Sequence, residues 1–196
     1  MPDGVLERWL EEVIATPGAT ALSEPAAARR VLLDDALRVV PLLAEFEGSV
    51  IDVGSGGGSP GIPVAASMPE RAFTLLEAER RKCAFLERFA AELPNVGVVW
   101  GRAEEQPVDG YGVALAKALA KPPVAIELCL PLVTPGGAAV LWVGRDVDLD
   151  PVRRVAERLG GSVESDLGGL VVVRKLTAAP AGFPRRPGMA KKCPLA

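Results

Sequence analysis

The stretch Val50-Ile51-Asp52-Val53-Gly54-Ser55-Gly56-Gly57-Gly58-Ser59-Pro60-Gly61-Ile62-Pro63 decides the fold. A short apolar strand, 49–53, runs directly into a turn rich in glycine. Glycine permits positive φ and lets backbone N–H groups approach a ligand closely. Pro60 and Pro63 suit the first turn of a helix, whose N-terminus attracts a carboxylate or a phosphate. The stretch therefore predicts a strand, a ligand-binding turn and a helix in succession.

Strands and helices alternate after this turn. We expect strands at 49–53, 71–76, 96–100, 112–116, 138–143, 162–166 and 170–175, helices at 79–93, 123–133 and 151–159, and a turn at 134–137. Strand–helix alternation predicts right-handed crossovers and a parallel sheet. Gly168-Gly169 indicates a closing hairpin that adds one antiparallel strand.

Two helices precede the first strand. Apolar residues recur at helical spacing over 3–15, and a second helix, with Ser23 as a candidate N-cap, runs to about Glu45 with a bend near Pro41. We therefore expect an α/β fold with a mostly parallel seven-stranded sheet and helices on both faces. Its expected divisions are a helical N-terminal cap at 1–46 packed on the main domain, the main domain at 47–176 and a basic C-terminal tail at 177–196.

The composition excludes several classes of function. The chain has 22 basic and 25 acidic residues, a net charge of -3 and no histidine. A basic field over the whole surface, histidine-based catalysis and histidine metal sites are therefore excluded. Cys83, Cys129 and Cys193 lie far apart, which predicts two buried thiols and one in the tail, with no disulfide and no metal site. No apolar run is long enough for a membrane span and the N-terminus lacks a signal peptide, so we expect a cytoplasmic monomer.

Two cofactors compete for the glycine-rich turn. Residues 56–61 satisfy the GxGxxG pattern of dinucleotide-binding proteins, although that pattern alone is weak evidence. Asp52 would repel a pyrophosphate but can attract the amino group of a methionine moiety. Glu77, 19 residues after Gly58, can accept hydrogen bonds from the ribose of either cofactor, and Glu104 follows the third strand where an adenine can bind. The combination favours S-adenosylmethionine, cradled by Gly54, Gly56 and Gly58.

Several stretches resemble one known family. These are the loop with its ending Pro60-Gly61-Ile62-Pro63, Thr74-Leu75-Leu76-Glu77 with Arg81-Lys82-Cys83-Ala84-Phe85-Leu86, Gly101-Arg102-Ala103-Glu104-Glu105, Glu127-Leu128-Cys129-Leu130-Pro131-Leu132 with Pro135-Gly136-Gly137, and Phe183-Pro184-Arg185-Arg186-Pro187-Gly188 with Ala190-Lys191-Lys192 and Pro194-Leu195. They resemble the RsmG (GidB) family over roughly residues 30–196. Members of that family are bacterial methyltransferases that modify guanine N7 in 16S ribosomal RNA.

The resemblance implies a class I, Rossmann-like methyltransferase fold, S-adenosylmethionine as the cofactor and small-subunit ribosomal RNA as the partner. By position, it places cofactor contacts on Gly54, Ser59, Ala103, Glu104 and Lys117. The chain also departs from the family pattern. Lys117 stands where arginine is usual, Ser59 replaces a bulky apolar residue, Glu77 replaces an aspartate and Val143 replaces a lysine.

The C-terminal tail carries cations but no acid. Arg185, Arg186, Lys191 and Lys192 can engage RNA phosphates, whereas the alternative is a solvated tail. No residue identifies itself as a catalyst, because guanine N7 has a free lone pair and needs no general base. The apolar faces around Trp9, Leu32, Phe85 and Phe89 are expected to form core, and no aromatic platform for RNA is expected.

Three alternatives stay open at this point. The chain can be a methyltransferase that acts on another substrate, or a protein that binds S-adenosylmethionine without turnover. A nicotinamide-dependent oxidoreductase is the least favoured of the three.

Overall fold

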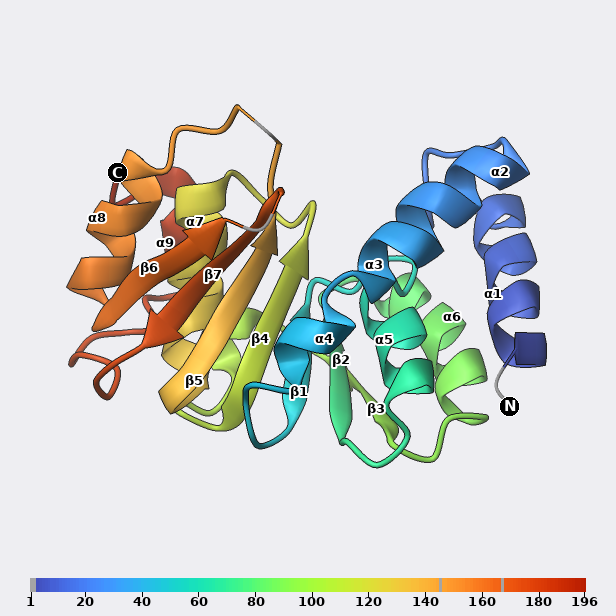
Figure 1. Cartoon of the computed structure of the whole chain (residues 1–196), viewed down its shortest axis with the longest axis horizontal. Helices are drawn as coiled ribbons and strands as arrows, with labels where there is room; N and C mark the ends of the chain where they lie inside the picture. The colour runs from blue at the N-terminus through green and yellow to red at the C-terminus, as the bar shows by residue number, and fades with distance from the viewer. Residues whose placement is uncertain (1–2, 145, 167) are drawn as a thin grey trace.

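A central β-sheet organises the computed structural model, which describes residues 3–144, 146–166 and 168–196. Within these ranges the sheet has seven strands in the order β3-β2-β1-β4-β5-β7-β6 (Figure 1). Strands β1 to β5 pair in parallel, and β7 lies antiparallel between β5 and β6, which confirms the expected topology. The strands are β1 (Val50–Val53), β2 (Phe73–Glu77), β3 (Val96–Trp100), β4 (Tyr111–Lys117), β5 (Val133–Trp142), β6 (Gly161–Asp166) and β7 (Leu170–Lys175).

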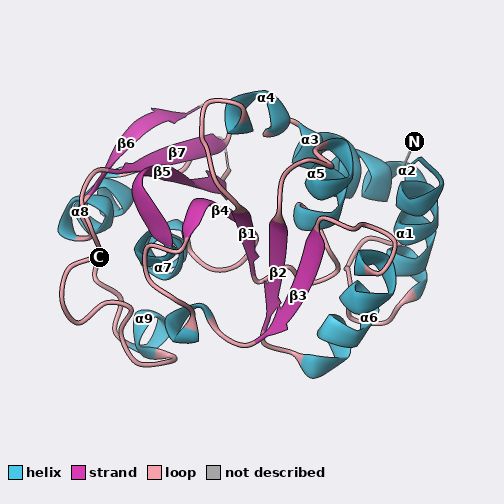
Figure 2. Cartoon of the chain, turned by 90° about the horizontal axis from the view of Figure 1, so that it is seen from below, coloured by secondary structure: helices cyan, strands magenta, loops and turns pink. Residues whose placement is uncertain are grey.

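Helices cover both faces of the sheet (Figure 2). Val50 and Ile51 point to opposite faces, as neighbours in a strand do. Val64 packs with Val50 on one face, and Ile126 packs with Ile51 on the other. The longer helices are α1 (Asp3–Ala15), α5 (Gly61–Ser67), α6 (Arg80–Ala90), α7 (Pro122–Cys129) and α8 (Asp150–Arg158), and the short ones are α2 (Pro25–Ala28), α3 (Asp35–Leu37), α4 (Val40–Leu43) and α9 (Met189–Lys192).

The N-terminal helices pack on α5 and α6. Trp9 and Val13 of α1 are buried in one cluster with Ile62 and Phe89. The expected second helix is divided, because α2 continues through a π-helical segment, Arg29–Asp34, into α3, and α4 follows separately (Figure 1). Its N-cap is Glu24 and not the expected Ser23, since the Glu24 carboxylate accepts the free N–H groups of the first turn.

Residues 134–137 belong to β5, whereas the sequence predicts a turn before that strand. The pairing between β4 and β5 shifts register between Tyr111 and Val113, so the extra residues form an irregularity within the strand. Gly137 is required there, because a Cβ atom would lie 2.1 Å from the carbonyl oxygen of Gly112. The Thr-Pro-Gly-Gly composition is typical of a turn, but here it permits close contact between two strands.

The C-terminal residues pack against the main domain. Ala190 is buried, and the partly buried Phe183 and Leu195 contact the same apolar cluster as α7 and α8. Cys83 and Cys129 are buried and Cys193 is exposed, as expected. The division at residues 46 and 176 stays a prediction. Among the described residues, no helix is both long enough and apolar enough to cross a bilayer.

Trp9→Ala is expected to lower the free energy of unfolding by about 3–5 kcal/mol. The change removes a fully buried ring and the hydrogen bond, 2.7 Å long, that Trp9 Nε1 donates to the carbonyl oxygen of Gly57. Urea denaturation measures this loss. Val108→Ala, at an exposed apolar position, should change the same quantity by less than about 0.5 kcal/mol. A loss of stability as small in Trp9→Ala as in Val108→Ala would show that the Trp9 contacts do not hold α1.

Candidate cofactor site

A cavity of about 670 Å³ lies at the carboxyl ends of β1, β2, β3 and β4. The strand order reverses between β1 and β4, and ligands of open α/β sheets bind at such a point. The volume is in the range of small-molecule and cofactor sites. The cavity is lined by residues 19–22, 31–32, 53–57, 76–79, 101–104 and 117–119, and by Trp9, Val13, Ser59, Lys82, Leu128, Gly188, Ala190 and Lys191.

The glycine-rich turn is tied to the end of β2. The N–H groups of Gly54 and Ser55 donate to the carbonyl oxygen of Leu76 at 2.8 and 3.0 Å. Gly56 has a φ of 55°, and a Cβ atom there would meet only the carbonyl oxygen of Gly54, at 3.8 Å. Because Gly54 and Gly56 both line the cavity, the missing side chain at Gly56 leaves room for a ligand against the backbone.

Gly58 has a different role from the one expected. It is not among the described residues that line the cavity, and its φ is 103°. A Cβ atom there would lie 2.5 Å from Ile62 Cδ1 and 2.9 Å from Trp9 Nε1. Gly58 is therefore needed for close packing of the turn against α1 and α5, and its role towards a cofactor stays a prediction.

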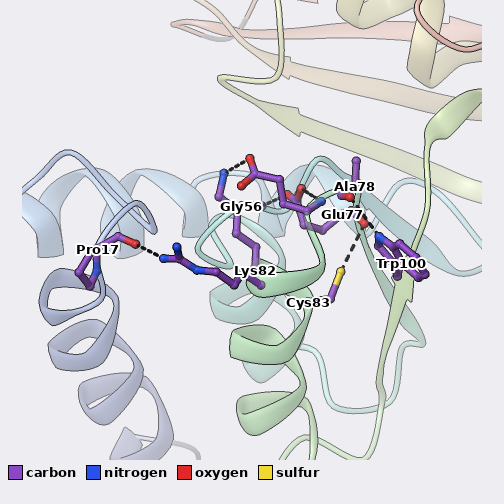
Figure 3. A network of polar contacts seen from close by, with 9 residues as sticks. Pro17, Gly56, Glu77, Ala78, Lys82, Cys83 and Trp100 are labelled. Atoms are coloured by element: carbon purple, nitrogen blue, oxygen red, sulfur yellow. Dashed lines mark hydrogen bonds and ion pairs between the residues drawn. The ribbon is translucent and has the colours of Figure 1, made fainter.

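Glu77 holds the turn by its carboxylate (Figure 3). Oε2 accepts the N–H of Gly56 at 2.9 Å and Oε1 accepts the N–H of Glu79 at 2.8 Å. The side chain is 7% exposed and lines the cavity. Each carboxylate oxygen has a second lone pair, so Glu77 can still accept hydrogen bonds from a ligand.

Asp52 lies behind the cavity wall. The residue is 1% exposed and does not belong to the described lining. Its Oδ2 accepts the N–H of Gly61 at 3.0 Å, and its Oδ1 has no hydrogen-bond partner among the described residues. The sequence allows Asp52 to attract the amino group of a methionine moiety directly or through water, and this role stays a prediction. The hydrogen bond from the Gly61 N–H to Asp52 fixes the start of α5.

Burial raises the pKa of Asp52 to about 7, and the nearby charge of Glu77 adds to this effect. The nearby hydroxyl of Ser55, the hydrogen bond from the Gly61 N–H and the positive charge of Lys117 oppose it. The carboxyl group is thus partly protonated near neutral pH in the folded protein.

Two side chains of the site attach to the N-terminal helices. Ser59 Oγ donates to the carbonyl oxygen of Leu32 at 2.8 Å. Lys117 Nζ pairs with Asp35 Oδ2 at 2.8 Å and also donates to the carbonyl oxygen of Val31. Ser59 and Lys117 both line the cavity, so these bonds join its wall to the π-helical segment and α3.

Ala103 and Glu104 lie in a 3₁₀ turn, Ala103–Glu105, after β3. Both line the cavity, and Ala103 is buried. Glu104 Oε1 accepts the N–H of Gly188 at 2.8 Å, which brings the C-terminal segment to the cavity. The sequence did not predict this contact, because residues 104 and 188 share no local pattern.

The four cations of the tail have different surroundings. Arg185 Nε and Nη2 bind the two oxygens of the buried Glu127 carboxylate at 2.5 and 2.8 Å. Arg185 is thus committed to an internal ion pair and not free for RNA, which corrects its expected role. Lys191 lines the cavity, and Arg186 and Lys192 are exposed.

The structure adds one feature of Trp9 and one of Trp100 that the sequence did not predict. Trp9 is core as expected, but it also lines the cavity. Trp100 is 62% exposed, although no exposed aromatic platform was expected. Trp100 ends an edge strand that alternates poorly between apolar and polar residues, so the sequence carried no signal for its exposure.

Solved structures share the fold of this chain. A protein from Corynebacterium glutamicum superposes with a TM-score of 0.59 at 18% identity, over 89% of this chain and 90% of that one. The T. thermophilus 16S rRNA N2 G1207 methyltransferase, solved with AdoMet and guanosine, superposes with a TM-score of 0.52 at 17% identity, over 69% of this chain and 37% of that one. The fold is that of the class I methyltransferases.

Sequence comparison identifies the family. The family model GidB, rRNA small subunit methyltransferase G, matches residues 6–153. Relatives named ribosomal RNA small subunit methyltransferase G include one from Acetivibrio thermocellus, 30% identical over 97% of this chain and 85% of that protein. One from Synechococcus elongatus is 34% identical over 90% of this chain and 81% of that protein. This chain belongs to the GidB family.

Protonation of Asp52 is expected to make stability depend on pH. The folded pKa of about 7 lies above that of the unfolded chain, so the contribution to stability is full below about pH 4. It is lost as the pH rises towards 7, on the order of 4 kcal/mol in total. Asp52→Asn should flatten this decline when free energies of unfolding are measured in urea across the range. Glu11→Gln, at an exposed position, should leave the decline unchanged. An equally steep decline in Asp52→Asn would refute the assignment.

Arg185→Lys is expected to destabilise the fold by about 1–3 kcal/mol, because lysine cannot bind both oxygens of the buried Glu127 carboxylate. Arg186→Lys is the matched control and should cost less than about 0.5 kcal/mol. Thermal and urea unfolding measure both. Equal and small effects in the two variants would mean that Arg185 does not anchor the tail.

Proposed function

We propose that this chain transfers a methyl group from S-adenosylmethionine to guanine N7 of small-subunit ribosomal RNA. The observation that carries the proposal is the open backbone of Gly56, held by Glu77 in the wall of the cavity in a chain of the GidB family. The proposal includes action as a cytoplasmic monomer.

The lining residues fit the parts of S-adenosylmethionine. Gly54 and Gly56 offer close approach to the backbone for its methionine part. Glu77 has lone pairs left for ribose hydroxyls, and Ala103 and Glu104, which also line the cavity, would hold the adenine. When bound, this cofactor supplies an electrophilic methyl group on a positively charged sulfur.

Positioning accounts for the chemistry that the chain must perform. Transfer from a sulfonium is an in-line displacement, so the chain must hold the acceptor nitrogen in line with the methyl group. Guanine N7 carries a lone pair and no proton, and no general base is needed. Lys117, which lines the cavity, is the candidate to contact the cofactor or the nucleotide.

Ribosomal RNA would meet the cations around the cavity. Lys82, Arg102 and Lys191 line it, and Arg186 and Lys192 lie nearby in the same tail. A local patch of this kind can bind phosphates although the net charge of the whole chain is -3.

Calorimetry is expected to show that S-adenosylmethionine binds and that NAD gives no response. Gly56→Val should lose this binding, because its side chain would enter the ligand space and its φ of 55° disfavours a branched residue. Gly97→Val is the control, since a Cβ atom at Gly97 meets nothing within 4 Å. Binding of NAD instead of S-adenosylmethionine would overturn the class of cofactor.

Transfer is tested by incubating the protein with small-subunit ribosomal RNA and methyl-labelled cofactor, followed by nucleoside analysis. Label in N7-methylguanosine is the expected result. Label in another nucleoside would overturn the assigned base. Binding of the cofactor without label in RNA would favour a protein that does not turn over on this substrate.

A further inference from the structure

Trp100 is a large, solvent-exposed apolar side chain at the end of the edge strand β3. It is 62% exposed, more than any other large apolar side chain among the described residues. Its Nε1 donates to the carbonyl oxygen of Ala78 at 3.0 Å, which fixes the orientation of the indole ring (Figure 3). The guanidinium carbon of Arg80 lies 5.2 Å from the ring centroid. An exposed ring with a fixed orientation is a preorganised binding surface.

The ring borders the cofactor cavity. Trp100 lines a shallow surface pocket together with Ala78, Gly101 and Arg102, and these three residues also line the main cavity. Trp100 itself is not part of the described lining of the main cavity. A ligand on its face would therefore lie beside the main cavity and not within it.

The charges around Trp100 suit a polyanion. Arg80 and Arg102 flank the ring, and neither makes an ion pair among the described residues. Of the nearby acids, Glu79 pairs with Lys82 Nζ at 2.7 Å, whereas Glu105 lines the same pocket and accepts only the backbone N–H of Arg102 at 3.1 Å. The cations Arg80, Arg102 and Lys82 still outnumber these two acids. Aromatic rings and arginine planes are the groups on which unpaired RNA bases stack.

We propose that Trp100 is a stacking surface for an unpaired base of the RNA substrate, next to the nucleotide that enters the cavity, with Arg80 and Arg102 facing the adjoining phosphates. This inference rests on the proposed function. A base from RNA fits better than the adenine of the cofactor, because the ring faces solvent beside the main cavity. A protein partner would find little apolar surface here, since the flanking side chains are charged.

The test compares Trp100→Ala with Trp100→Phe in binding small-subunit ribosomal RNA. Loss of base stacking should weaken binding by Trp100→Ala about 5- to 100-fold. Trp100→Phe keeps an aromatic face and should recover most of the affinity. Leu176→Ala removes another exposed apolar side chain and should bind RNA like the wild type. Affinity for S-adenosylmethionine, measured on the same samples, should be unchanged in all of them.

A second measurement detects the stacked base directly. Titration with an oligoadenylate should quench tryptophan emission in the wild type. Trp100→Phe should lose most of that quenching, because Trp9 is fully buried and Trp142 is partly buried with its Nε1 bound to the carbonyl oxygen of Asp35. RNA binding by Trp100→Ala equal to that of the wild type would overturn the inference. A parallel loss of cofactor affinity would also overturn it, since Trp100 would then serve the cofactor cavity. Failure of the wild type to bind ribosomal RNA would instead overturn the proposed function.

Discussion

The hydrogen bonds between the end of β2 and the glycine-rich turn are the constraint on which the site depends. Glu77 joins the turn to the start of α6, because its two oxygens accept N–H groups from Gly56 and Glu79. Leu76 adds its carbonyl oxygen to Gly54 and Ser55. Hydrogen bonds to a charged group in a partly buried place are among the stronger ones in proteins. They hold the glycine-rich turn in one conformation, in which residues 54–57 line the cavity.

Segments from both ends of the chain complete the wall around this turn. Trp9, Ser59 and Lys117 connect the N-terminal helices to the turn and to the end of β4. On the other side, the buried pair of Arg185 and Glu127 holds the tail, so that Gly188 reaches Glu104. Ser59 and Lys117, the two family contact positions whose residue types are unusual, both bind the segment from Val31 to Asp35. Ser59 and Lys117 therefore connect the N-terminal helices to the site.

The order of elements was predictable from sequence, because strand and helix periodicities are local. The same holds for the glycine-rich turn and for Glu77, which follow directly from strand ends. Glu127 and Arg185 were not predictable as a pair, since nothing local connects positions 58 residues apart. The packing role of Gly58 was missed because its neighbours, Trp9 and Ile62, meet only in the folded chain. The prediction of a turn at 134–137 was wrong, because Thr-Pro-Gly-Gly has the composition of a turn while the backbone continues as a strand.

The placement of Gly188, Ala190 and Lys191 in the cavity wall has a consequence for synthesis on the ribosome. All the strands emerge before these residues do, so a nascent chain can build its sheet while one side of the cavity is still absent. N-terminal parts generally fold first as a chain is made. The cavity can close only when residues 188–191 are free to reach Glu104 and Arg185 can reach Glu127. Completion of the cavity therefore follows the synthesis of every described strand of the sheet.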